Sequence, residues 1–400
     1  MMSSSALHTE PGDRFGAWVC GDRKVMARRP ESLSGLPIGV KDVIATRDYP
    51  TQCGTALTKA VIHELLGTDE AACVSDLKHA GAIVAGKTVT AELATYQPGR
   101  TVNPLDVTRT PGGSSSGSAA AVAAGDVGLA LATQTAGSTI RPASFCGLYG
   151  FKPSFGRYDL TGVLATSPTL DTLGLIADEL KLIEAADGAL TASDAQLGET
   201  VEQSPRRLVL YRTSNWAVLP EEHQQQIEDL AKRLAGGFGE YREQDPVAEL
   251  DVLIGDQQTV HAGELASVLG WLVTEHNGLV SDVFKRFVAQ GQRYVGPMLD
   301  TAIHAIHKAR STAHEHIHPD EVWLTPAVTS VAPPIEVGTG DPLFCRQWTA
   351  LGVPCLTVPL LRERSTNLPF GPQLIMSPGS DRRLIEVGKA IMEQIGEGEY

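Results

Sequence analysis

An α/β fold is predicted for this 400-residue chain from three observations. Helical patterns are followed by short apolar runs of strand length, and this alternation is typical of layered α/β proteins. Hydrophobic residues make up 42% of the sequence and charged residues 20%, which is an ordinary balance for a soluble globular protein. Neither an internal repeat nor a low-complexity linker interrupts the chain, so we expect one continuous domain.

The first half of the chain carries the clearest alternation. Residues 1–35 are polar and interrupted by prolines, so we expect them to be peripheral. The run 36–46 predicts a short strand, and 69–88 predict a helix followed, after Gly81, by a buried strand at 82–85. An alanine-rich helix is expected at 118–124 and a buried strand at 127–132.

Beyond residue 177, helical patterns dominate. Residues 177–200 predict an amphipathic helix, 221–240 a charged surface helix that ends in glycines, and 262–318 a mostly helical region. The remaining apolar runs predict strands or strands with turns, at 206–213, 250–255, 320–328, 353–360 and 370–375.

Charge and cysteine usage limit the classes of partner and compartment. The formal net charge of −14 argues against a broad surface for nucleic acid or anionic membranes, since both need clustered lysine and arginine. The 6 cysteines are scattered without metal-type spacing, as expected of free thiols in a reducing compartment. No signal-peptide layout and no apolar run of membrane-spanning length is visible, so we expect a cytoplasmic protein.

Two serine-glycine clusters, at 112–118 and 137–138, flank a run of small apolar residues. Serine and glycine favour turns and caps, where backbone amides are left free. Lys41 lies inside the apolar run PIGVKDV, where burial would lower its pKa and make it a base, unless the side chain reaches outward to solvent. A buried lysine combined with two serine clusters favours a serine–lysine hydrolase.

Three other interpretations are weaker. Residues 113–117 match the G-x-S-x-G nucleophile elbow, but no strand is predicted before them. The same loop opens a helix and could bind phosphate, yet it matches neither common phosphate-loop pattern. Five histidines within 304–318 have spacings that could hold a metal on a helix, but such clusters usually form a solvated face, so no metal site is expected.

The combination of these segments closely resembles the amidase signature family. The matching motifs are GVKDV at 39–43, PGGSSSGSAAAVAAG at 111–125 and QTAGSTIRPASFCGLYGFKPSFGR at 134–157. The resemblance is strong over 35–177 and weaker over 320–390. It implies a single domain over 1–400 with a mixed central β-sheet surrounded by α-helices. Its parts are a core with the catalytic motifs at 35–177, a variable substrate-pocket region at 178–319 and the C-terminal part of the core at 320–400.

Matched position by position, the resemblance implies a catalytic triad of a serine, a second serine on a cis peptide, and a lysine. Ser138 corresponds to the nucleophile, Ser114 to the bridging cis-serine and Lys41 to the terminal base. The backbone amides of Thr135, Ala136, Gly137 and Ser138 correspond to the oxyanion hole.

Two further residues are candidate contacts for the substrate. Arg141 is usually structural in the family, but in some members it pairs with a substrate carboxylate. Ser115 follows the cis-serine and often supports the site, although a helix-cap role is the simpler interpretation.

The expected function is therefore hydrolysis of the C–N bond of a small amide, carbamate or ureide through an acyl-enzyme, without a metal or cofactor. Polar residues among the hydrophobes of 256–278 favour compact and polar acyl groups. The alternatives are a catalytically silent binding protein and a glutamine-hydrolysing amidotransferase subunit. The expected partner is a small-molecule amide, with no nucleic acid and no membrane; a homodimer is left open.

Overall fold

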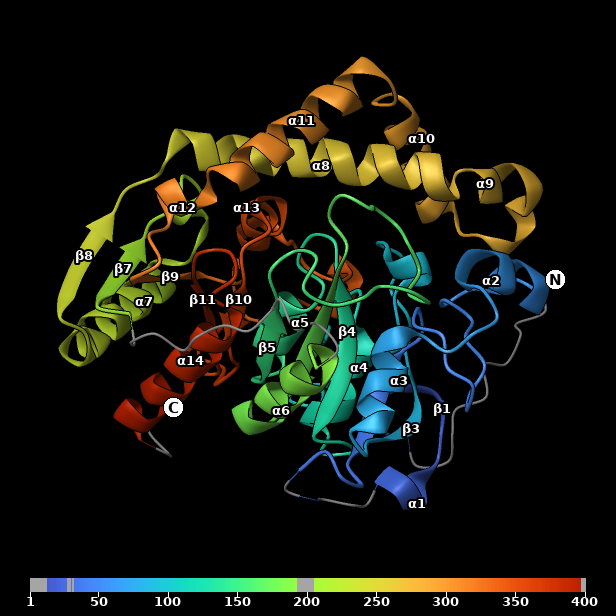
Figure 1. Cartoon of the computed structure of the whole chain (residues 1–400), viewed down its shortest axis with the longest axis horizontal. Coiled ribbons are helices and arrows are strands. Elements are labelled where there is room, and N and C mark those ends of the chain that lie inside the picture. Colours follow the sequence, from blue (N-terminus) through green and yellow to red (C-terminus); the bar gives the residue numbers. More distant parts are fainter. Residues whose placement is uncertain (1–12, 27–29, 31, 193–204, 397–400) are drawn as a thin grey trace.

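A mixed sheet of 11 strands runs through the protein, in the order β1-β3-β2-β4-β6-β5-β10-β11-β9-β7-β8 (Figure 1). The structure is a computed structural model that describes residues 13–26, 30, 32–192 and 205–396. The strands are β1 Trp18–Gly21, β2 Pro37–Lys41, β3 Ile83–Thr88, β4 Leu129–Gln134, β5 Tyr149–Lys152, β6 Thr172–Ala177, β7 Arg207–Tyr211, β8 Glu240–Gln244, β9 Glu321–Pro326, β10 Cys355–Thr357 and β11 Pro372–Ile375. Strand β2 pairs in parallel with β3 and β4, and β7 with β8 and β9, whereas the other pairs are antiparallel. The predicted α/β class with a mixed central sheet is confirmed.

Helices cover both sides of this sheet. Figure 1 shows α8 running across the top of the molecule, with α10 and α11 packed against it, while α3, α6 and α14 lie below. The α-helices are α1 Arg23–Met26, α2 Lys59–Leu66, α3 Ala72–His79, α4 Ser116–Ala123, α5 Ile140–Phe145, α6 Leu180–Leu190, α7 Glu221–Leu234, α8 Ala248–Leu269, α9 Trp271–Glu275, α10 Asp282–Gln292, α11 Pro297–Ser311, α12 Ala313–His316, α13 Leu343–Leu351 and α14 Asp381–Ile395. None of the described helices combines the length and apolarity that crossing a bilayer requires.

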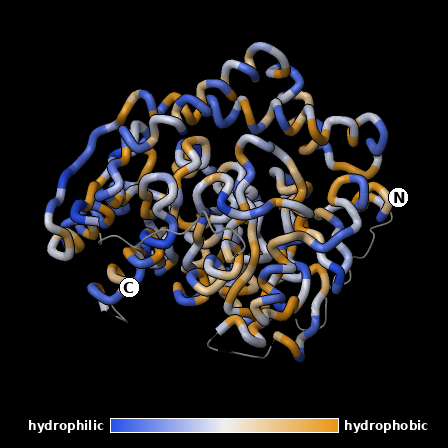
Figure 2. Tube along the Cα trace, in the orientation of Figure 1, coloured by the Kyte–Doolittle hydropathy of each residue, from blue (hydrophilic) through white to orange (hydrophobic). Residues whose placement is uncertain are grey.

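Burial follows the order of the strands. Every residue of β4 and β6, at the centre, is buried, and both strands are built from apolar residues and small polar ones. The edge strand β8 is instead half-exposed and carries the charged sequence EYREQ, visible as the hydrophilic left margin of Figure 2. Charged side chains on an edge strand discourage pairing with another chain.

Most elements lie where the sequence predicted them. Strand β2 falls within 36–46, α3 and β3 within 69–88, and α7 begins at Glu221. The helix predicted at 177–200 is present as α6 up to Leu190, and its last part, 193–200, lies outside the described residues.

Two predictions were wrong. Residues 250–255 were expected to form a strand but belong to α8. Leu250 and Leu253, three residues apart, are buried while Val252 is exposed, so the run lines one face of a helix. Residues before 35 were expected to be peripheral, yet β1 pairs with β3, and Trp18 is fully buried with its indole N–H donating to Asp126 at 2.7 Å.

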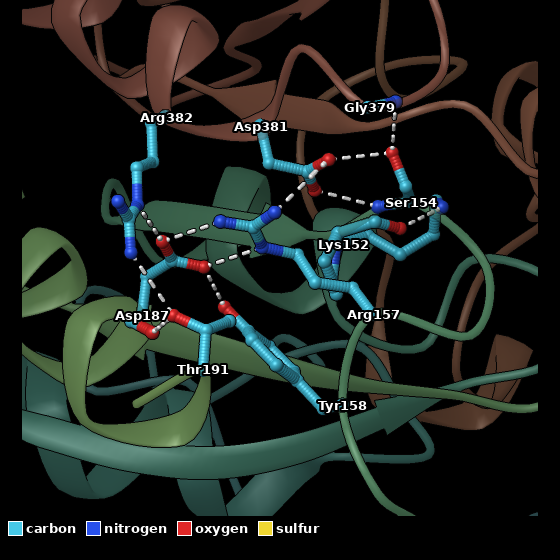
Figure 3. A network of polar contacts seen from close by, with 10 residues as sticks. Lys152, Ser154, Arg157, Tyr158, Asp187, Thr191, Gly379, Asp381 and Arg382 are labelled. Atoms are coloured by element: carbon cyan, nitrogen blue, oxygen red, sulfur yellow. Dashed lines mark hydrogen bonds and ion pairs between the residues drawn. The ribbon is translucent and has the colours of Figure 1, made fainter. Parts of the chain in front are cut away.

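A buried network of charges joins the middle of the chain to its C-terminal helix (Figure 3). Arg157 donates two parallel hydrogen bonds to the carboxylate of Asp187, at 2.7 and 2.8 Å, and lies 3.7 Å from Asp381. Tyr158 also donates to Asp187, and Ser154 donates to Asp381 through its amide and its hydroxyl. Because each carboxylate receives several donors, these buried charges are compensated.

Candidate active site

Lys41 stands at the end of β2, between β3 and β4, with its side chain completely buried. Its Nζ donates to Ser114 Oγ at 2.8 Å and to Thr133 Oγ1 at 2.6 Å. Burial lowers the pKa of Lys41 to about 7, although the negative charge of Asp171 opposes the shift. A lysine in this place is therefore substantially neutral near pH 7 and can accept a proton through its contact with Ser114.

The loop before α4 carries Ser114 under close packing. Gly112 has φ +86°, and a Cβ there would lie 2.9 Å from the Cα of Pro142, so only glycine fits. The peptide bond between Gly113 and Ser114 is cis. Ser114 is 2% exposed, and its carbonyl accepts a hydrogen bond from the amide of Ala91. The hydroxyl is thereby held against Lys41.

The other serines of this cluster bond to the backbone of the sheet. Ser115 Oγ lies 3.3 Å from the carbonyl and 3.4 Å from the amide of Thr133, and it does not cap α4 with its side chain. Ser116 donates to Val89 O, and Ser118 donates to Leu131 O. These three hydroxyls fasten the start of α4 to β4 and to the residue after β3.

The second loop, residues 135–139 between β4 and α5, has its carbonyls occupied. The carbonyl of Thr135 accepts from Gln257 Nε2 at 2.9 Å, that of Ala136 from Thr349 Oγ1 at 2.7 Å, and that of Gly137 from the amide of Arg141 at 3.0 Å. Within the described part of the chain, no group accepts a hydrogen bond from the amides of Ala136, Gly137 or Ser138. Fixed carbonyls with free amides are the arrangement that an oxyanion hole requires.

Two contacts tie this loop to the Ser114 loop. Ser115 bonds to Thr133 just before it, and Arg141 Nη2 donates to the carbonyl of Gly113 at 2.6 Å just after it. Ser138 lies between these ties and is partly exposed, and no hydrogen bond of its hydroxyl to another described residue is present. Exposure thus decreases from Ser138 through Ser114 to Lys41, the order expected for a nucleophile, a relay and a base.

Arg141 is 3% exposed and does more than the sequence suggested. Besides Gly113, its Nη2 lies 3.4 Å from Thr339 Oγ1, while its Nε and Nη1 are buried without a partner among the residues described. Burial lowers the pKa of Arg141 to about 10. The guanidinium therefore stays charged at neutral pH and keeps two unused donor groups near the loop of Ser138.

A cavity of about 800 Å³ lies beside this loop. One wall contains Gly340 and Pro342, and a Cβ placed at Gly137 would lie 2.9 Å from the Cβ of Pro342. The opposite walls come from α8 and α10, and Arg346 of α13 also lines the cavity. This volume is in the range of small-molecule sites.

Several residues that build the site were not among the sequence-predicted candidates. Thr133 contacts Lys41, and the carboxylate of Asp171 accepts from Thr135 Oγ1 at 2.6 Å. Gln257 reaches the loop from α8, and Arg346 Nη1 donates to Gln257 Oε1 at 2.6 Å. Asp171 stands in a motif that already resembled the family, but Gln257 and Arg346 belong to no local pattern.

Comparison with known proteins agrees with this architecture. The family model for Amidase matches residues 21–237. A subunit of the glutamyl-tRNA(Gln) amidotransferase of Anaeromyxobacter dehalogenans (strain 2CP-C) is 30% identical over 436 residues, covering 96% of this chain and 87% of that protein. A crystal structure of an amidase superposes with a TM-score of 0.81 at 24% identity, covering 95% of this chain and 92% of that one. The peptide amidase from Stenotrophomonas maltophilia gives 0.75 at 24% identity, covering 96% and 90%.

These matches define an enzyme class that acts on carbon–nitrogen bonds, and the protein is an amide-hydrolysing enzyme. The chain belongs to the amidase signature family.

Proposed function

We propose that this enzyme hydrolyses a small amide, carbamate or ureide through Lys41, Ser114 and Ser138. The contact between Lys41 Nζ and Ser114 Oγ carries the proposal, because a fully buried amine with a pKa of about 7 has a hydroxyl as its hydrogen-bonded neighbour. Such a lysine can take a proton from the serine near neutral pH, which an ordinary lysine with a pKa of 10.5 cannot.

In the first half-reaction, Ser138 Oγ attacks the substrate carbonyl carbon. The Ser138 proton passes to Ser114, and the proton of Ser114 passes to neutral Lys41. The free amides of Ala136, Gly137 and Ser138, with that of Thr135 at the start of the loop, bind the oxyanion as negative charge develops. When the C–N bond breaks, Ser114 gives a proton to the leaving nitrogen and regains one from Lys41, which leaves an acyl-enzyme on Ser138.

In the second half-reaction, water attacks the acyl carbon. Its proton moves along the same path to Lys41, and the intermediate collapses by breaking the bond to Ser138 Oγ, which recovers its proton. The acid is released and Lys41 is again neutral. Every proton that leaves a group is returned within the cycle, so the route needs no cofactor.

Arg141 and Ser115 have supporting parts in this proposal. Arg141 holds the Ser114 loop through the carbonyl of Gly113, and its Nε and Nη1, without a partner among the described residues, are donors for a polar group close to the scissile bond, such as a carboxylate. Ser115 is completely buried and acts indirectly, by holding Thr133 in place beside Lys41.

A serine-directed fluorophosphonate tests the proposal. We expect wild-type protein to be labelled stoichiometrically at Ser138, with loss of ammonia release from a panel of small amides and ureides. Ser138→Ala should prevent both labelling and turnover while circular dichroism stays unchanged, whereas the matched control Ser116→Ala, a serine outside the triad, should keep both. Labelling of Ser138→Ala, or turnover by it at the wild-type rate, would exclude Ser138 as nucleophile.

The relatives named as amidotransferase subunits favour one alternative, in which the same triad releases ammonia from glutamine for a partner. Expression in the source cell with an affinity tag separates the two functions. Stable co-purification of further subunits together with glutamine hydrolysis would favour the amidotransferase, and an isolated chain that hydrolyses small amides without glutamine preference would favour the amidase.

A further inference from the structure

Arg346 lines the cavity beside the Ser138 loop without an ionic partner among the described residues. The side chain is 7% exposed, Nη1 donates to Gln257, and Nε is buried without a hydrogen bond to any described residue. A buried guanidinium with unused donors costs free energy unless a ligand or water supplies acceptors. The cavity is the place from which an acceptor can arrive.

The charges around Arg346 leave it positive. Asp341 and Arg286 also line the cavity, but both are exposed, and no ion pair between Asp341 and Arg346 is present in the described structure. His261 packs behind the cavity against Phe287, and burial lowers its pKa to about 3, so it is neutral at physiological pH. Among the residues that the structure describes, the inner wall therefore has one cation, Arg346, while the mouth carries one charge of each sign.

A carboxylate fits this arrangement better than a neutral group. The planar guanidinium presents donors in a fork that matches two carboxylate oxygens, and hydrogen bonds to an ionised acceptor are about twice as strong as neutral ones. The cavity supplies polar side chains, among them Gln258, Thr259 and Gln290, beside apolar Phe287. This lining suits a short chain that ends in an acid.

We propose that the substrate carries a carboxylate remote from the scissile amide and that Arg346 binds it. The inference rests on the proposed function for the location of the scissile bond at Ser138. It goes beyond Arg141, which lies next to the nucleophile and does not line the cavity.

Arg346 is also joined to the chemistry through Gln257. Its Nη1 donates to Gln257 Oε1, and Gln257 Nε2 donates to the carbonyl of Thr135 in the oxyanion loop. A purely structural role for Arg346 would act through this link and would weaken turnover of acidic and neutral amides alike. Recognition of a carboxylate would weaken only the acidic ones, so the ratio of the two separates the roles.

The test compares monoamides of dicarboxylic acids, such as succinamate and glutaramate, with neutral amides of the same length. We expect wild-type kcat/KM to favour the acidic member of each pair by at least about tenfold. Arg346→Gln should lower this ratio by about 10- to 100-fold, mainly through KM. The matched control Arg293→Gln removes the same charge from an exposed position outside the cavity and should leave the ratio unchanged. No acidic preference in the wild type, or an equal ratio in Arg346→Gln, would overturn the inference.

Binding of glutarate to Ser138→Ala, measured by calorimetry, separates this inference from the proposed function. Glutarate should bind, and adding Arg346→Gln should weaken its binding at least tenfold. If no amide is hydrolysed but this difference is found, the proposed function fails and the carboxylate site stands. If amides are hydrolysed through Ser138 and glutarate binds equally to both proteins, or to neither, the carboxylate site fails and the proposed function stands.

Discussion

The acid side of the pH–rate profile should report directly on Lys41. Burial lowers its pKa from 10.5 to about 7, a change that corresponds to about 5 kcal/mol. Only the neutral amine can act as base, so kcat/KM should rise with pH and level off above the midpoint. About a tenth of the maximal rate is expected at pH 6, half at pH 7 and about nine-tenths at pH 8.

Stability gives a second measurement that needs no activity. The folded pKa lies below the unfolded one, so between them the unfolded state binds more protons and the free energy of unfolding rises with pH. The cost of burying Lys41 is absent above about pH 10.5, grows as the pH falls to about 7, and is constant below that. Lys41→Met removes this cost, so its stability relative to wild type should increase by up to about 5 kcal/mol over the same window.

The assay combines ammonia release between pH 5.5 and 9.5 with urea unfolding of wild type and Lys41→Met across the same range. Lys87→Met, another buried lysine of the sheet, is the control for losing a buried amine without changing the catalytic base. A flat activity profile, or a stability difference between wild type and Lys41→Met that does not change with pH, would refute the assignment of a neutral Lys41.

The remaining predictions concern charge, positioning and stability. Asp171→Asn removes the negative charge that raises the pKa of Lys41, so the acid limb of activity should move to lower pH in the same rate assay. Gln257→Leu deletes the hydrogen bond to Thr135 O and should lower kcat about 2- to 10-fold, with a smaller change in KM by steady-state kinetics. Asp187→Ala leaves Arg157 buried without its bidentate partner and should lower the free energy of unfolding in urea by about 3–5 kcal/mol. Dialysis against a strong chelator should leave activity unchanged, and a loss reversed by added metal would contradict the metal-free route.

The catalytic motifs could be found from the sequence because each is local. The glycines and serines around Ser114 and Ser138 lie in short loops with unusual composition, and Lys41 is conspicuous in an apolar strand. The sequence could not show that Gln257 and Arg346 complete the site, since they reach it from α8 and α13, far along the chain from the catalytic motifs. Such contacts arise from tertiary packing and leave no periodic signal.

The wrong assignment of residues 250–255 has a related cause. A short apolar run can belong to a strand or to one face of a helix, and its own composition does not decide between them. Here Leu250 and Leu253 pack inward from α8, whose full length of 22 residues becomes evident only from the structure. Trp18 was missed for the opposite reason, because β1 has only 4 residues and lies in a polar segment.

The order of strands in the sheet has a consequence for synthesis of the chain on the ribosome. Strands β1 to β6 form a contiguous set, but β5 gains its second neighbour only with β10, at residues 355–357. Similarly, β7 joins the sheet through β9, and β9 is connected to the rest through β11, the last of the described strands to be made. The nascent chain therefore displays open strand edges until it is nearly complete, and open edges promote pairing between chains. Chaperone dependence should consequently be greatest for chains truncated between β6 and β10, and recombinant fragments ending there should aggregate.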